Sequence, residues 1–114
     1  MTEIDIPFSR EMAIAAIEGR KIATTRSEPK GKVGDTFDIW HPDVPKNEAC
    51  KFFATPNFRL IEVLQEELPY VKEVYYRLEG FDSPEAFEKT WRALHRGHFT
   101  VGKPYYIHFF GRVI

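Results

Sequence analysis

The segment GRKIATTRSEPKGKVG, residues 19–34, concentrates side chains that can bind an anion or line a polar pocket. Lys21, Thr24, Thr25 and Arg26 fall within six residues, and a basic loop follows them. Five Lys and Arg residues stand against one acid in the segment, for a net charge of +4. Such a segment can meet phosphate, but an ordinary strand with one face in water has the same composition. Spacing alone leaves both interpretations open.

Residues 21–26 are rich in β-branched side chains and predict a strand. In an ideal strand Thr24 and Arg26 share one face, whereas Thr25 points to the other. By the same alternation Lys21 lies on the face of Thr25. However, Lys21 is the first residue of the strand, and its long side chain can curl toward Thr24. If the segment lines a pocket, we expect Lys21, Thr24 and Arg26 on the pocket side and Thr25 on the opposite side.

These residues must be positioned by a small number of elements. Ser9 is a suitable cap for a first helix that ends at Gly19, and Asp82 or Ser83 can cap a later helix that begins with Pro84. Helices are predicted at 9–18, 69–80 and 82–97, and strands at 21–26, 36–40, 50–55, 58–65 and 103–114. The pattern predicts one α+β domain over residues 1–114, built on a mixed or antiparallel β-barrel of about five strands with two or three peripheral helices.

Composition excludes several classes of protein. The net charge of −1 argues against a dedicated duplex-DNA binder, although residues 61–90 carry −5 and so oppose the basic segment. The start of the chain lacks the pattern of a signal peptide, and no apolar run is long enough to span a membrane. We therefore expect a soluble, cytoplasmic protein with no membrane partner.

Neither a metal site nor a reactive thiol is expected. His95 and His98 are separated by Gly97, which should end the helix between them, and His41 and His108 are isolated. Cys50 is the only cysteine and heads an apolar run, as a buried inert thiol does. The chain also lacks a glycine loop of the phosphate-cradling type. No metal and no organic cofactor are therefore predicted.

Four segments in order resemble the ASCH family, a branch of the PUA-like superfold of small β-barrels with peripheral helices. They are GRKIATTR, KVGDTFDI, LEGFDSPEAFEKTW and YYIHFFGRVI. The matching positions are Lys21, Thr24, Arg26, Gly34, Asp35, Glu79, Gly80 and Phe81. The resemblance covers nearly the whole chain and departs at the long Pro-containing loop between Trp40 and Cys50.

The resemblance implies an RNA-associated domain. In one bacterial branch that removes the acetyl group from acetylcytidine, the catalytic set corresponds to Lys21, Thr24 and Glu79 here. A Thr hydroxyl needs a base to take its proton, and a Lys can be that base when burial or a neighbouring cation lowers its pKa. Glu79 would then protonate the leaving amine or orient Lys21. The expected binding groups are Arg26, Arg20, Lys30 and Lys32, with Trp40, Tyr105 or Tyr106 as possible stacking surfaces.

Three functions remain open from the sequence. The first is a module that binds RNA or a nucleoside in a cleft lined by Lys, Thr, Arg and Glu. The second is a metal-independent amidohydrolase that deacetylates acetylcytidine, with Thr24 as nucleophile and Lys21 as base. The third is another small-ligand or protein-interaction role. The same residues serve binding and catalysis, so the first test is whether Lys21, Thr24 and Glu79 converge on one open cleft.

Overall fold

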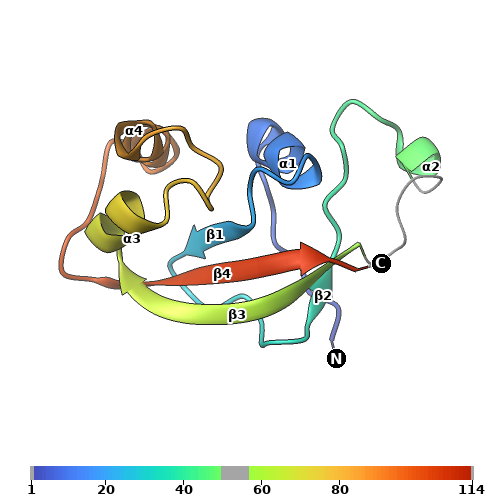
Figure 1. The fold of residues 1–114 in the computed structure, drawn as a ribbon, viewed down its shortest axis with the longest axis horizontal. Helices are drawn as coiled ribbons and strands as arrows, with labels where there is room; N and C mark the ends of the chain where they lie inside the picture. The colour runs from blue at the N-terminus through green and yellow to red at the C-terminus, as the bar shows by residue number, and fades with distance from the viewer. Residues whose placement is uncertain (1, 50–56, 114) are drawn as a thin grey trace.

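A computed structural model shows an antiparallel sheet with helices on one side (Figure 1). The structure describes residues 2–49 and 57–113. In chain order its elements are α1 (Arg10–Ile17), β1 (Ala23–Arg26), β2 (Thr36–Phe37), α2 (Lys46–Ala49), β3 (Phe58–Glu67), α3 (Leu68–Val74), α4 (Pro84–Leu94) and β4 (Pro104–Arg112). Figure 1 shows α1, α3 and α4 above the sheet, with β1 passing between α1 and α4.

The sheet has the strand order β1-β4-β3-β2, so β4 lies between β1 and β3. All three strand pairs are antiparallel. The register places Thr24 opposite His108 and Thr25 opposite Ile107. A bulge at Ile61 interrupts the pairing of β3 with β4 between Leu60 and Glu62. Such a bulge increases the local twist, and β3 curves strongly in Figure 1, which gives the sheet the form of a half-barrel.

The helix ends follow the local signals of the sequence. The Ser9 side chain accepts a hydrogen bond from Met12 N, and the Ser83 side chain accepts one from Ala86 N, so Ser83 is the cap of α4. Gly19 adopts φ +82°, and the amides of Gly19 and Arg20 donate to the carbonyls of Ala16 and Ala15. This is a Schellman motif. It ends α1 and turns the chain toward β1 within two residues.

Two apolar clusters hold the helices against the sheet. One lies under α1 and includes Phe37, Phe58 and Phe110, whose rings contact one another at centroid distances of 5.6–5.9 Å. The other joins α3 and α4 to β1 and β4 through Leu68, Val71, Phe87, Trp91, Tyr105 and Ile107. Polar residues of β1 and the turn before α4 lie between these clusters, and this is where the candidate site forms.

The fold differs from the sequence prediction in strand number, in the short helix α2 within the loop expected after Trp40, and in several element boundaries. Within 2–49 and 57–113 the sheet has four strands rather than about five, and the strand predicted at 50–55, with Cys50, lies outside the described residues. β2 stops at Phe37 because the Asn57 side chain, rather than a neighbouring strand, bonds both the amide and the carbonyl of Ile39. Helix α3 ends at Val74 instead of Gly80, and β1 begins at Ala23 instead of Lys21.

No helix in the described part of the chain is both long and apolar enough to cross a membrane. The same ranges contain no group of three or more His, Cys, Asp and Glu side chains arranged as metal ligands.

Candidate functional site

Lys21 enters the protein interior directly after the end of α1. Its amide donates to the Ala15 carbonyl at 3.1 Å, so its backbone is held by the same turn that ends the helix. The side chain is 2% exposed. It passes close to Gly80, where an added Cβ would lie 3.1 Å from the Lys21 Cβ. Gly80 also has φ +96°, which side chains rarely tolerate, so glycine suits this position on two counts.

Glu79 reaches the same place from the turn that follows α3. The amide of Glu79 donates to Tyr75 O, and the carbonyl of Leu78 accepts from the amides of Ile22 and Ala23. These bonds fasten the turn to the start of β1. The Glu79 side chain is 3% exposed and therefore lies in the interior.

The Glu79 carboxylate accepts hydrogen bonds on both of its oxygens. Lys21 Nζ lies 3.3 Å from Oε1 and 2.9 Å from the Glu79 carbonyl, and Thr25 Oγ1 donates to Oε2 at 2.7 Å. Lys21 and Thr25 therefore act on one carboxylate from the same side of the strand. The expectation that Thr25 faces away from the site was wrong, because strand alternation keeps Thr25 on the side of Lys21.

Thr24 and Arg26 form a second group of polar side chains in the same pocket as this ion pair. Thr24 Oγ1 accepts a hydrogen bond from Arg26 Nη1 at 2.6 Å. Arg26 also donates to Thr25 O at 3.2 Å and to Pro7 O at 2.6 Å, and its guanidinium lies over the Phe8 ring at 5.4 Å. Arg26 thus ties β1 to the segment that leads into α1.

Of the other three basic residues that were expected to bind a ligand, one lines the pocket and two lie outside it. Lys30 lines the same pocket as Lys21 and Arg26. Arg20 instead pairs with Glu18 on the surface, and the Lys32 amide donates to Asp35 Oδ2 within the turn before β2. Neither Arg20 nor Lys32 is among the described residues that line the pocket.

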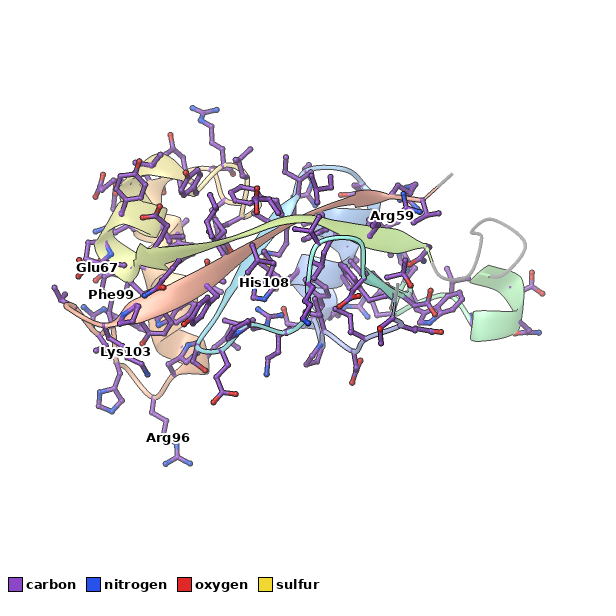
Figure 2. The ribbon with its side chains drawn as sticks, turned by 90° about the horizontal axis from the view of Figure 1, so that it is seen from below. Arg59, Glu67, Arg96, Phe99, Lys103 and His108 are labelled. Atoms are coloured by element: carbon purple, nitrogen blue, oxygen red, sulfur yellow. The ribbon has the colours of Figure 1, made fainter. Side chains whose placement is uncertain are left out.

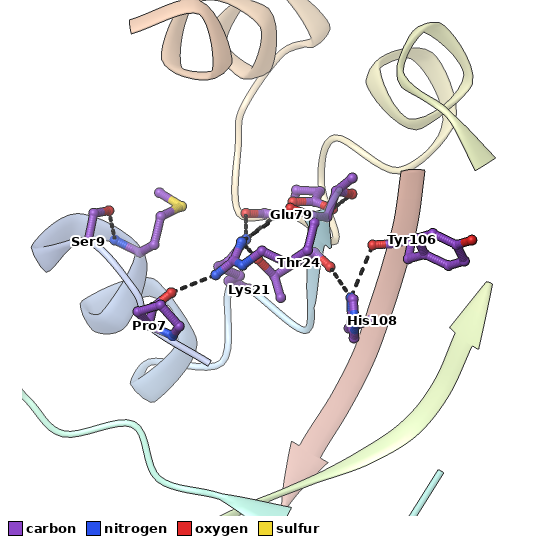
Figure 3. A network of polar contacts seen from close by, with 10 residues as sticks. Pro7, Ser9, Lys21, Thr24, Glu79, Tyr106 and His108 are labelled. Atoms are coloured by element: carbon purple, nitrogen blue, oxygen red, sulfur yellow. Dashed lines mark hydrogen bonds and ion pairs between the residues drawn. The ribbon is translucent and has the colours of Figure 1, made fainter. Parts of the chain in front are cut away.

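His108 is a buried member of the site that sequence reasoning treated as isolated. Its Nε2 accepts from the Lys30 amide at 2.9 Å, so the ring proton is on Nδ1, which donates to Tyr106 O at 3.0 Å and Thr24 O at 3.2 Å (Figure 3). Figure 2 shows His108 in the middle of the molecule, whereas Arg96 points outward. The signal in the sequence was a lone His in the otherwise aromatic and apolar run YYIHFF.

A pocket of about 470 Å³ opens between α1, β1 and α4. This volume is typical of small-molecule sites, which span roughly 300–1,000 Å³. Its polar floor and its α1 side consist of Pro7, Phe8, Ser9, Met12, Lys21, Thr24, Thr25, Arg26, Ser27, Lys30 and Glu79. Its other side consists of Phe81, Phe87, Thr90, Trp91, Leu94 and His95.

The α4 wall was not assigned to the site from the sequence. His95 was expected to take no part in a metal site, and Trp91 belongs to the apolar cluster under α4. Both residues line the pocket, and their rings stack at a centroid distance of 4.0 Å and 11° between planes. Tyr105 packs edge-on against Trp91 in the core. Trp40, Tyr105 and Tyr106 are not among the described residues that line the pocket, and the rings of Trp91 and His95 on the α4 side line it instead.

Burial shifts the pKa values of the basic groups at and beside the pocket floor. Removal from water lowers the pKa of the Lys21 ammonium, and the facing Glu79 carboxylate opposes this shift. Burial also lowers the pKa of the Arg26 guanidinium, but that group stays charged because its ordinary pKa is above about 12. Burial lowers the pKa of His108, and the hydrogen bonds to Thr24 O and Tyr106 O oppose this shift. The nearby charges of Arg26 and Lys30 add to the lowering, so the ring is neutral at neutral pH.

The Lys21–Glu79 pair can be tested by removing its members singly and together. Lys21→Met should lower the free energy of unfolding by about 3–5 kcal/mol, because it leaves the buried Glu79 carboxylate without its cation. The double variant Lys21→Met/Glu79→Leu should recover most of this loss, since both charges are then absent. Urea unfolding measures these values. The exposed pair of Arg20 and Glu18 is the control, and Arg20→Met should cost at most about 1 kcal/mol. Additive losses in the double variant would contradict the buried pairing.

The His108 contacts predict an acid-sensitive fold. The unfolded chain takes up a proton on this ring near its ordinary pKa of about 6.5, whereas the folded chain does so only at lower pH. Stability is therefore fully present above pH 6.5 and is lost below it, by at most about 1.4 kcal/mol per pH unit from this group. Urea unfolding of His108→Gln between pH 7.5 and 5.5 should show a smaller slope than the parent, whereas His98→Gln, at an exposed histidine, should not. Equal slopes for the parent and His108→Gln would refute the assignment.

Comparisons with known proteins address the fold. No protein-family model matches the chain, and no curated protein sequence matches it. Among solved structures it is similar to the crystal structure of protein EF3133 from Enterococcus faecalis V583, which is described by the family DUF984. The match has a TM-score of 0.55 and 19% sequence identity, and it covers 91% of this chain and 71% of the other. This likeness establishes a shared small α+β fold, while membership of the ASCH family stays a prediction.

Proposed function

We propose that the pocket between α1, β1 and α4 binds a nucleoside. The observation that carries the proposal is the pairing of a polar floor with an aromatic wall in one small cavity. Lys21, Thr25 and Glu79 provide donors and acceptors at the floor, and Trp91 with Phe81 provides ring surfaces. Nucleobases are recognised by this combination, with hydrogen bonds to the base edge and stacking on the base face.

The location of the cations favours a single nucleoside over a long RNA strand. Binding along a polymer needs a basic surface that follows many phosphates. Arg20 is paired with Glu18 and Lys32 belongs to a separate turn, so these two charges do not extend the basic end of the pocket. A cavity of about 470 Å³ also suits one small ligand.

Nucleoside binding is tested by calorimetric titration with cytidine, uridine, adenosine and guanosine. Thr25→Val keeps the shape of the side chain but removes the hydroxyl that holds Glu79, and should weaken binding about tenfold, as expected for loss of one hydrogen bond to a charged group. Thr100→Val removes a hydroxyl from an exposed loop and should leave affinity unchanged. If none of the four nucleosides binds the folded protein at millimolar concentration, the proposal is wrong.

A second candidate is hydrolysis of the acetyl group of acetylcytidine. It is favoured by the lowered pKa of Lys21, which brings the amine closer to acting as a base. The Arg26 donor occupies a lone pair of Thr24 Oγ1 and leaves the hydroxyl proton for transfer. Thr24 Oγ would attack the acetyl carbon while Lys21 takes its proton. The C–N bond then breaks, the amine of cytidine leaves with a proton, and water releases acetate from Thr24.

The hydrolase candidate is decided by following cytidine release from acetylcytidine chromatographically. Thr24→Val should abolish turnover, because no hydroxyl remains to form the ester, and Thr24→Ser should retain part of it. Thr100→Val should turn over at the rate of the parent. Nucleoside binding without any release of cytidine above a Lys21→Ala control would leave the binding function and exclude the hydrolase.

A further inference from the structure

The pocket carries more positive than negative charge. Among the described residues that line it, the basic side chains are Lys21, Arg26 and Lys30, and Glu79 is the one acidic side chain. Glu79 is close enough to stabilise the charged forms of both Lys21 and Arg26, and Arg26 in turn disfavours the charge on Lys21. One buried carboxylate is thus shared between two cations, and the pocket has an excess of positive charge before any ligand enters.

This excess is located where water offsets it poorly. Lys21 is 2% exposed and Arg26 is partly buried, so their charges are only partly solvated. A desolvated charge without a full counter-charge is costly, and an anion placed beside it recovers that cost. Apart from Glu79, no Asp or Glu in the described part of the chain lines the pocket, so a ligand is the natural source of the second negative charge.

The two ends of the pocket differ in chemistry. At the α1 end, Arg26 lies over Phe8 and bonds Pro7 O, and at the opposite end Trp91 and His95 stack on α4. Lys30 follows β1 in the chain, and its amide donates to His108, the residue that pairs with Thr24 in the sheet. A ligand with a flat apolar part and an anionic part would therefore fit in one orientation only.

Arg26 retains donors for such an anion. A guanidinium has five N–H groups. Three of them are used, two on Nη1 toward Thr24 and Thr25 and one on Nη2 toward Pro7. Within the described residues no contact occupies Nε–H or the second Nη2–H. Phosphate accepts hydrogen bonds from Arg and Lys strongly, because both partners are charged.

We infer that the ligand is a nucleoside 5′-monophosphate, with its phosphate between Arg26 and Lys30 and its base toward Trp91. This inference rests on the proposed nucleoside function and adds the charged group that the pocket selects. It also separates Lys30 from Lys32, two lysines of one loop that the sequence does not distinguish. Only Lys30 lines the pocket, whereas Lys32 belongs to the turn closed by Asp35.

The experiment compares each nucleoside with its 5′-monophosphate by calorimetric titration at low salt. The monophosphate should bind about tenfold or more tightly than the nucleoside, and salt should reduce this difference by screening. Lys30→Ala should bring the affinities for nucleoside and monophosphate to within about twofold of each other. The variant retains the Lys30 amide and hence the bond to His108. Lys32→Ala removes an equal charge from the same loop and should behave as the parent.

Each other outcome overturns the inference. Equal affinity for nucleoside and monophosphate would reject the phosphate site and leave the nucleoside function intact. An equal loss of the phosphate advantage in Lys30→Ala and Lys32→Ala would reject the local site in favour of a general charge effect. Tighter binding of single-stranded RNA than of the monophosphate would assign recognition to a larger surface. Binding of neither nucleoside nor monophosphate would reject the proposed function itself.

Discussion

The carboxylate of Glu79 is the acceptor on which the floor of the pocket depends. It holds Lys21 through Oε1 and Thr25 through Oε2, and all three side chains are almost completely buried. A lysine ammonium in the interior is stable only beside such a partner. The contact also joins residues 58 positions apart, because Glu79 comes from the turn after α3 and Lys21 from the end of α1. Local backbone geometry serves this contact at both ends, through the Schellman turn and through Gly80.

The ion pair of Lys21 and Glu79 lies between the two apolar clusters. It makes the floor of the space between them polar and charged. The cluster under α1 and the cluster under α4 each pack against the same sheet, and neither extends across the polar residues of β1. The pocket is therefore a gap between two packed units rather than a hollow within one. Its aromatic wall belongs to one unit, its cationic end contacts the other, and β1 with its buried threonines connects them. This arrangement places an aromatic wall and cationic side chains in one pocket of a small fold.

Sequence reasoning succeeded where the cause of structure is local. Ser9 and Gly19 fix the two ends of α1, and Ser83 fixes the start of α4, through bonds to near neighbours. Residue type alone predicted these positions, with Asp82 left open as the alternative to Ser83. It failed where the structure of a segment depends on a residue that is distant in the sequence. The Asn57 side chain makes the hydrogen bonds to Ile39 that a neighbouring strand would otherwise make. The residues around Ile39 contain no pattern that predicts this contact. Thr25 was misplaced because Lys21 was expected to leave its strand face, whereas Glu79 keeps both residues on that face.

The candidate site shows the same division. The meeting of Lys21 with Glu79 was expected from a resemblance to a family and not from spacing, since the two residues are far apart in sequence. His108 and the α4 wall were missed because their part in the site comes from strand order and helix packing. From sequence alone, a histidine in an apolar strand or a tryptophan on an amphipathic helix is assigned to the hydrophobic core. A role in a pocket becomes visible only when the neighbouring elements are known.

The central place of β4 has a consequence for how the protein is made. β1 has β4 as its partner in the sheet, and His108 of β4 bonds Thr24, 84 positions earlier in the chain. During translation, residues 23–26 must therefore wait for almost every other described element to emerge before they can be ordered. Contacts of such long sequence separation slow folding. The pocket floor should therefore be among the last parts of a nascent chain to form.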